Sequence, residues 1–229
     1  MTFRKWIFSI VAVSIAAISI ALGFWQLRRL SARRQANALV ESRRLAPEVE
    51  LASLPSDTAA ARFRKVHVRG IYDHAHEIIL TLRGRDGSPG VNILTPLLRA
   101  RNDTAVLVNR GWVYAPDGMS VDTRPWREAD TLNGRGYVEI FPTKGPFAPP
   151  NPARPRSFRR LNRPDLQKAF PYPIANYYVV LTDSTVSSHV PPRVEAAALD
   201  EGPHRNYAIQ WFSFAVISIV GLVIFLRRT

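Results

Sequence analysis

Two long apolar runs bracket the chain, and a polar segment with shorter apolar stretches lies between them. The first run, Trp6–Leu27, holds 22 residues and no charged side chain. The second, Tyr207–Leu226, holds 20 residues, and its only strongly polar member is Gln210. A helix rises about 1.5 Å per residue and the hydrocarbon core of a bilayer is about 30 Å thick, so each run can span a membrane. The second run is apolar on every face, which argues against a helix buried in a soluble core.

A secretory signal peptide is the alternative for the first run, because Arg4 and Lys5 precede it. Signal peptides have an apolar core of about 7 to 15 residues, followed by small residues at the cleavage site. This run is longer and ends in Phe24, Trp25 and Gln26, so we expect a retained anchor. Two spans place both termini on one side of the membrane. Basic residues flank both ends of the first span, and long loops translocate largely regardless of charge, so the charge count leaves the orientation open.

The segment between the spans changes from helical to strand-like patterning near residue 63. Ser31 is a favoured N-cap residue, and we expect a charged helix from it to about Arg44, followed by a short helical turn at 54–61. Beyond this point, stretches rich in Val, Ile and Leu alternate with breaks of Gly, Pro, Asn and Asp. These stretches are 64–72, 77–82, 91–98, 105–113, 136–141 and 177–182. Their spacing, without intervening helical periods, predicts a mainly antiparallel sheet or partly closed barrel rather than a parallel α/β fold.

The expected fold is therefore a membrane protein in which two transmembrane α-helices bracket a mainly antiparallel β (α+β) domain. A proline-rich loop at 149–155 and a short helix at 164–169, with Pro164 at its first position, complete the domain. The expected parts are a first span at 6–27, a helical extension and connector at 28–62, a β-rich domain at 63–190, a linker at 191–206 and a second span at 207–226.

Composition narrows the classes of partner and chemistry. The net charge is +13, with a sequence pI of about 10.9, but the basic residues are scattered and no aromatic–basic RNA motif is present. We therefore expect no nucleic-acid partner and relate the charge to anionic membrane lipids. The absence of cysteine excludes disulfides and cysteine-ligated zinc. The sequence also contains no G-x-S-x-G, H-E-x-x-H or phosphate-loop motif, so hydrolytic chemistry lacks support.

Aromatic, amide and basic side chains gather where the two spans meet the intervening segment. Antiparallel spans place these ends at the same depth. The cluster consists of Gly23, Trp25, Gln26 and Arg29 from the first run, and His204, Tyr207, Gln210 and Trp211 from the second. On a helix, His204, Tyr207, Ala208 and Trp211 would form one stripe. A haem suits such a pocket, because histidine binds iron, aromatic rings cover the macrocycle and arginines pair with propionates. The alternative is an ordinary interfacial belt of aromatic and snorkelling basic residues.

Three other histidines suggest a weaker alternative. On a strand, His74 and His76 would point to one face, with His67 nearby, and could bind a metal ion. The competing interpretation is that the stretch from Asp73 to His76 is a solvated turn between strands.

A second motif of interest follows the apolar run Val106–Val108. Gly111 after a strand suggests a bulge or a close approach of another backbone segment. Arg110 and Trp112 are residue types that dominate binding hot spots, so they could face a partner. The alternative is an interior tryptophan beside a structural arginine.

These residues also carry a resemblance to the Surfeit locus protein 1 family. Residues 22–29 match its L-G-x-W-Q-x-x-R motif, and residues 106–113 read V-L-V-N-R-G-W-V, as in its strand motif. Residues 204–212 match its H-x-x-Y-A-x-Q-W-F motif, and Gly70 fits its strand glycine. The motifs occur in order along the whole chain. Because no transit extension precedes the first span, the chain is similar to a bacterial member.

The resemblance implies a non-catalytic assembly factor for haem-copper cytochrome c oxidase, active in respiratory chain biogenesis. It implies that haem a is bound transiently and delivered to oxidase subunit I, with haem a synthase as a further partner. It also implies a multi-pass protein of the bacterial plasma (inner) membrane, with cytoplasmic termini and a periplasmic domain.

In the family, haem a binding is associated with a histidine that corresponds to His204, which would ligate the iron axially. The other expected haem contacts are Trp25, Tyr207 and Trp211 at the ring and Arg29 and Arg205 at the propionates. The leading alternative is a cofactor-free membrane scaffold that stabilises an oxidase assembly intermediate. A membrane sensor and an enzyme are further alternatives that no motif favours.

Overall fold

The computed structural model describes residues 3–54, 58–99, 102–142, 153–183 and 189–228. The chain forms two compact units. One, the helical unit, comprises Met1–Ser42 and Ala197–Thr229, and the other, the β unit, comprises Arg43–Ala196. Most of the proline-rich loop expected at 149–155 lies outside the described residues.

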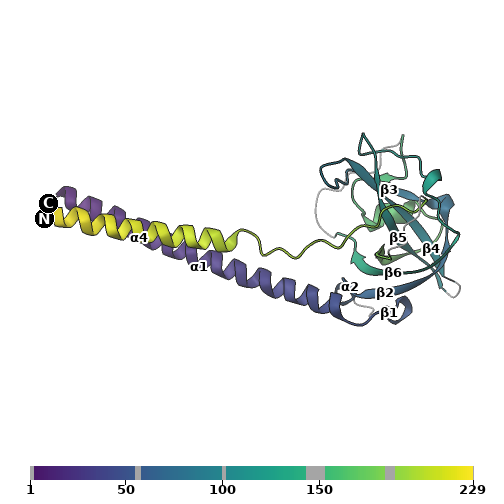
Figure 1. The fold of residues 1–229 in the computed structure, drawn as a ribbon, viewed down its shortest axis with the longest axis horizontal. Coiled ribbons are helices and arrows are strands. Elements are labelled where there is room, and N and C mark those ends of the chain that lie inside the picture. Colours follow the sequence, from purple (N-terminus) through teal and green to yellow (C-terminus); the bar gives the residue numbers. More distant parts are fainter. Residues whose placement is uncertain (1–2, 55–57, 100–101, 143–152, 184–188, 229) are drawn as a thin grey trace. The chain divides into compact units, whose positions relative to one another are not determined.

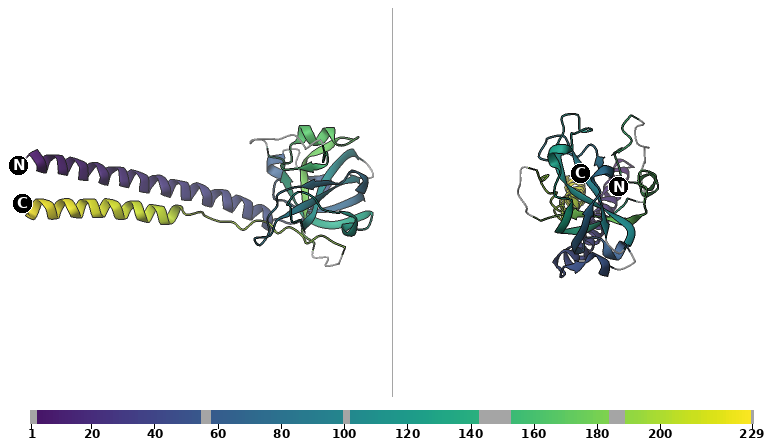
Figure 2. Two further views of the ribbon diagram at one scale, coloured as in Figure 1. Left: turned by 90° about the horizontal axis from the view of Figure 1, so that it is seen from above. Right: turned by 90° about the vertical axis from the view of Figure 1, so that its right-hand side faces the viewer.

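The helical unit consists of two antiparallel helices, α1 (Phe3–Leu45) and α4 (His204–Arg228), which lie side by side in both views (Figures 1 and 2). Both are long and apolar enough to cross a membrane, and most of their large apolar side chains are exposed. The expected charged helix to about Arg44 is present as a continuation of the first span, but Ser31 does not cap it, because α1 runs through this position without a break. The reason is that residues 24–46 contain many strong helix formers and neither Gly nor Pro. Pro47 follows the end of the helix.

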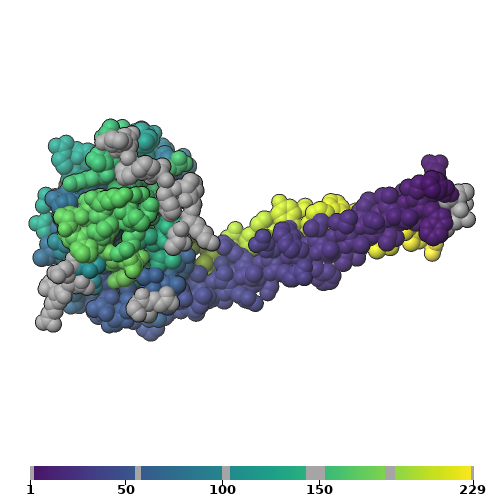
Figure 3. Space-filling model, turned by 180° about the vertical axis from the view of Figure 1, so that it is seen from behind, coloured from purple at the N-terminus to yellow at the C-terminus, as the bar shows by residue number. Residues whose placement is uncertain are grey.

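Small residues allow the two helices to pack closely. The buried positions of α1 recur at spacings of three and four, and they are Ala12, Ala16, Ser19, Gly23, Gln26 and Leu30. A Cβ on Gly23 would come within 2.7 Å of the Phe212 ring, so glycine allows this ring to pack directly on α1. Nearer to the N-terminus of α1, Ser218 of α4 donates a hydrogen bond to the carbonyl oxygen of Ala12 at 2.9 Å. This is the small-residue packing typical of membrane helices, and Figure 3 shows the two helices in contact.

The β unit is built around an eight-stranded sheet that closes on itself. The strands are β1 (Val49–Glu50), β2 (Lys65–Tyr72), β3 (Ile78–Leu80), β4 (Gly90–Arg99), β5 (Asn102–Tyr114), β6 (Thr131–Ile140), β7 (Ser157–Phe158) and β8 (Ile174–Leu181). Their order is β1-β2-β6-β8-β5-β4-β3-β7, and an additional β2–β4 pairing closes a barrel of β2, β6, β8, β5 and β4. The predicted β-rich fold is confirmed, and the barrel is fully closed. Pairs within it are antiparallel except β5 with β8.

All six predicted strand segments are strands, but β6 starts five residues before the predicted start at Gly136. Its early part was missed because it contains Asn133 and Gly134, residue types that rarely occur in strands. At Gly136, where the predicted segment begins, tertiary packing explains the glycine, since a Cβ there would lie 2.4 Å from the Val180 carbonyl oxygen. The two-residue strands β1 and β7 are too short to leave a pattern in the sequence.

Apolar residues on both faces of β5 are buried, which explains its continuous apolar run. Val106 and Val108 belong to one core cluster with residues of β2, β6 and β8. Leu107 belongs to a second cluster with Leu166 of the short helix α3 (Arg163–Lys168) and the nearby Phe170. The predicted helix at 164–169 is thus present, and it covers the outer face of the barrel. The short helix α2 (Thr58–Ala61) is the described part of the turn expected at 54–61.

Candidate functional site

The first residue of α4 meets the middle of α1 through a histidine and a buried amide. His204 is the first residue of α4, and its Nδ1 lies 2.9 Å from Oε1 of Gln26 on α1. Gln26 is only 8% exposed, whereas His204 is half-buried. The predicted juxtaposition of the two clusters is therefore present in the structure.

The contact with Gln26 determines how His204 can act. A glutamine oxygen is only an acceptor, so the Nδ1–H group of His204 donates this hydrogen bond. In the neutral ring the proton is then on Nδ1, and Nε2 retains the lone pair that can ligate a metal. Beside that edge of the ring, Gly202 adopts a φ of +72°, and a Cβ there would lie 3.6 Å from Nε2. The glycine therefore leaves space next to the potential ligand atom.

The expected aromatic stripe is only partly present. Ala208 is buried and Trp211 half-buried, so with His204 they form the face of α4 that packs on α1. Tyr207 is 47% exposed and Trp25 is 44% exposed, so both lie toward the outside of the helix pair. Tyr207 is three residues after His204 and four before Trp211 on α4, as the predicted stripe requires, but it lies at the exposed edge of that stripe.

Arginines of α1 hold the segment that leads into α4. Arg34 forms a two-point ion pair with Glu201, at 2.8 and 2.9 Å, which holds the pKa of the Glu201 carboxyl below its ordinary value. Arg33 donates to the backbone oxygen of Asp200 at 2.9 Å. These contacts position the start of α4, where His204 lies. Arg29, by contrast, stacks over the Trp25 ring at 5.3 Å.

Arg205 completes the predicted site residues. It occupies the second position of α4 and is exposed. Its positive charge acts on Glu201, so it lies in the same polar region above the helix pair.

In the β unit, the motif around Arg110 builds a buried ionic network. The register of β4 and β5 shifts opposite Arg110, so this residue forms a bulge, and its side chain is fully buried. The guanidinium binds Glu77 at 2.6 Å and Glu128 at 3.0 Å, and it also donates to the Trp126 carbonyl oxygen. The hypothesis that Arg110 faces a partner is wrong, because its guanidinium is buried in the interior and paired with two carboxylates.

Arg193 extends this network to the segment that leaves the barrel. It binds both oxygens of Glu128 at 3.0 Å and Asp183 at 3.2 Å. Burial tends to raise the pKa of Glu128, but Arg193 and Arg110 outweigh it and lower that pKa below its ordinary value. Both expectations for Gly111, a bulge and a close approach of another backbone segment, are confirmed. Gly111 directly follows the bulge at Arg110, and a Cβ on it would lie 2.5 Å from the Pro192 carbonyl oxygen.

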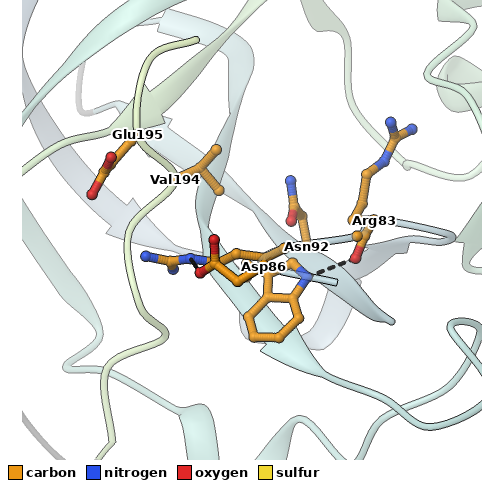
Figure 4. Close-up of a pocket in the computed structure, with 8 residues that line it drawn as sticks. Arg83, Asp86, Asn92, Val194 and Glu195 are labelled. Atoms are coloured by element: carbon orange, nitrogen blue, oxygen red, sulfur yellow. Dashed lines mark hydrogen bonds and ion pairs between the residues drawn. The ribbon is translucent and has the colours of Figure 1, made fainter. Parts of the chain in front are cut away.

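Trp112 lines a cavity of about 380 Å³ on the other side of the strand (Figure 4). Its indole nitrogen donates to the carbonyl oxygen of Arg83 at 2.7 Å, and Arg85 lies over its ring at 6.0 Å. Figure 4 shows Val194 and Glu195 on the side of the cavity opposite Arg83. The indole is half-buried, so it combines a structural hydrogen bond with an exposed edge.

The remaining histidines have structural partners. His76 binds Asp73 at 2.7 Å, and the same carboxylate accepts a hydrogen bond from Tyr172 at 2.7 Å. His74 is in the same short 3-10 turn, so the expected turn between strands is confirmed and the two histidines are not on a strand. The side chain of His74 is largely buried rather than solvated. His67 lies between Glu50 and Asn133. Across the described residues, no group of three or more acidic or histidine side chains could hold a metal ion.

A model of the SURF1 family matches residues 13–216 of the chain. The chain belongs to the SURF1 family. It is 26% identical to a SURF1-like protein of Rickettsia conorii over 92% of this chain and 88% of that protein. It is 24% identical to a SURF1-like protein of Rickettsia felis over 96% of this chain and 97% of that protein. The Surfeit locus protein 1 of Homo sapiens is 28% identical over 66% of this chain and 54% of that protein.

The SURF1 family is associated with the assembly of cytochrome c oxidase. Two of the motifs that identify this SURF1 member meet in the helical unit: Gln26 of the first contacts His204 of the last, and Gly23 of the first contacts Phe212 of the last. The strand motif contributes Arg110 to the buried network of the β unit. Sequence reasoning missed Glu77, Glu128 and Arg193, because nothing in their local patterns links carboxylates to an arginine so distant in the chain.

Proposed function

We propose that this chain is a membrane-anchored assembly factor for haem-copper cytochrome c oxidase that binds haem a through His204 and aids its insertion into subunit I. The observation that carries the proposal is the hydrogen bond between Gln26 and His204, which leaves Nε2 available as a ligand. Family membership supports the link to the oxidase.

The residues present fit an iron ligand of this kind. A ligating histidine commonly donates its other ring N–H to a fixed acceptor, which sets the tautomer and the orientation of the ring. Gln26 does this from a buried position on α1. The haem iron would supply an open coordination position, and His204 would fill it. A single neutral ligand on a half-buried ring suits a cargo that must be released.

The neighbouring residues would bind the rest of the group. Trp211, half-buried next to Ala208, can cover part of the macrocycle. Arg29 and Arg205 remain the proposed partners for the propionates. Trp25 and Tyr207 face outward from the helix pair, so they would contact a ring held at its outer surface.

The same proposal places both helices in the bacterial inner membrane, with the termini in the cytoplasm and the β unit in the periplasm. Their exposed apolar surfaces support a membrane location. Subunit I of the oxidase is the proposed recipient, and haem a synthase is the proposed donor.

A cofactor-free scaffold is the second candidate function. It is favoured by an exposed apolar pair on the barrel wall, where Ile71 of β2 pairs with Leu98 of β4. These side chains are 56% and 37% exposed. Such a pair suits contact with a protein partner.

The test is an optical spectrum of the full chain purified from cells that make haem a. We expect a haem spectrum in the wild type, its loss in His204→Ala and a reduced haem content in Gln26→Leu, because the second variant frees the ring without removing it. Asn206→Ala, an exposed position in the first turn of α4, is the matched control and should keep the wild-type spectrum.

If His204→Ala retains the full haem content with an unchanged spectrum, the ligand assignment is wrong. A wild-type chain without haem in these cells, which still co-purifies with subunit I, would favour the scaffold.

A further inference from the structure

A second cavity in the β unit, separate from the Trp112 cavity, combines aromatic walls with cationic side chains. Its volume is about 420 Å³, within the range of about 300 to 1,000 Å³ usual for small-molecule sites. Phe63 and Tyr137 provide the aromatic surface, and Arg44, Lys65 and Arg135 provide the charge. No residue of the proposed haem site is part of it.

Phe63 lies in this wall in a backbone conformation that favours glycine. Its φ is +66°, because α2 ends here: the Arg62 amide bonds back to Thr58 and the Arg64 amide to Ala61. Glycine or asparagine usually occupies such a position at the end of a helix. A bulky residue in this region is strained, and such strain clusters at binding sites.

Two guanidinium groups lie on the Phe63 ring. Arg62 is 4.5 Å and Arg44 is 5.6 Å from its centroid. The ring is therefore fixed in place, although it is only half-buried.

The charge around the cavity is unbalanced. Lys65 of β2 is directly opposite Tyr137 of β6 in the strand register, and Arg135 lies two residues away on the same face. Among the lining residues these two and Arg44 are cationic, and Glu48, which pairs with Arg135 at 3.3 Å, is the only carboxylate. A bound anion would lower the repulsion among the three cations.

The cavity also lies where the chain enters and leaves the β unit. Arg44 is near the first residue of the unit, and Ala196 is its last. A ligand here would contact the first and the last segment of the β unit.

We propose that this cavity binds a single-chain amphiphile with a carboxylate head. The apolar chain would pack on Phe63 and Tyr137, and the head would lie near Lys65 and Arg135. Aromatic surface alone would accept a neutral chain, and charge alone would accept a free anion. The combination selects a molecule that has both parts.

The probe is 11-(dansylamino)undecanoate, whose fluorescence rises in apolar surroundings, added to the full chain in amphipol. Its methyl ester is the uncharged control ligand. We expect saturable binding of the acid, weakened about tenfold or more in Lys65→Gln/Arg135→Gln, because a charge-assisted contact contributes roughly that factor. The matched control is Lys168→Gln/Arg159→Gln, which removes two exposed cations elsewhere on the β unit and should leave the affinity unchanged.

A second variant tests the space rather than the charge. Ala196→Trp fills the cavity from a position outside any helix or strand and should also abolish saturable binding, with an unchanged circular dichroism spectrum. Equal affinity of all variants, or equal affinity for the ester, would overturn the proposal. So would displacement of the probe by inorganic phosphate as effectively as by dodecanoate, because the apolar chain would then contribute nothing.

Discussion

Arg110 offers the sharpest test of how the β unit is held together. Arg110→Met keeps the unbranched apolar stem of the side chain and removes the charged guanidinium from a fully buried site. The two carboxylates that Arg110 binds differ in the partners that remain to them after this substitution. Glu128 still has both oxygens paired with Arg193, whereas Glu77 keeps only a hydrogen bond from Thr95 at 2.7 Å and a distant contact with His74 at 3.8 Å.

The expected loss of stability follows from this difference. Removing one partner of a buried ion pair costs about 3 to 5 kcal/mol, because the remaining charge is uncompensated. For a unit of this size, each kcal/mol lowers the melting temperature by roughly 2 to 4 °C. The melting temperature of Arg110→Met should therefore fall by about 6 to 20 °C.

Two double variants identify the responsible carboxylate. Adding Glu77→Gln to Arg110→Met neutralises the orphaned charge and should recover most of the loss. Adding Glu128→Gln should lower stability further, since it weakens the pairing with Arg193. The assay is thermal unfolding of the full chain, followed by the strand signal in circular dichroism.

Equal rescue by the two glutamine substitutions would refute this reasoning, and so would a fall of less than about 3 °C in Arg110→Met, which is below the range expected for a buried orphan charge.

Two further predictions concern the same network. The pKa of Glu128 is held below its ordinary value. Its contribution to stability is therefore complete above about pH 5 and is lost as the pH falls through the pKa of the folded state. When the unfolding temperature is measured as the pH is lowered, it should fall less in Arg193→Ala than in the wild type. Gly111→Ala should lower the unfolding free energy by about 1 to 3 kcal/mol, because the φ is +149° and the new Cβ would lie 2.5 Å from the Pro192 carbonyl oxygen. Gly84→Ala, with its nearest neighbour 3.8 Å away, is the control, and an equal loss there would contradict the steric explanation.

The elements of the fold were largely predictable, because their signals are local. Each of the two apolar runs is long enough for a bilayer crossing, and the six strand segments are rich in β-branched residues between turn residues. The start of β6 was not predictable, since Asn133 and Gly134 are unusual strand residues and the pairing of this segment with β2 involves residues far along the chain. The helical extension of the first span was predictable, but Ser31, a common N-cap residue, lies at an exposed position inside α1 and caps no helix.

That the residues around Gln26 and His204 form a cluster was predictable, but which of their side chains face the partner helix was not. Antiparallel spans necessarily place Gln26 and His204 at one level. Which side chains face the partner helix depends on the rotation of each helix, and this is set by the small-residue seam that includes Gly23. That rotation buries Gln26 and leaves Trp25 and Tyr207 outside.

The sequence by itself determined the two membrane helices, the β-rich domain between them and the family, because each depends on residue types at short spacing. The tertiary structure alone decided that the barrel closes through β2 and β4, that Arg110 is an interior cation and that the amide oxygen of Gln26 contacts Nδ1 of His204. Each of these depends on contacts between residues distant in the chain, and it is the balance of packing, desolvation and charge at those contacts that selects one arrangement.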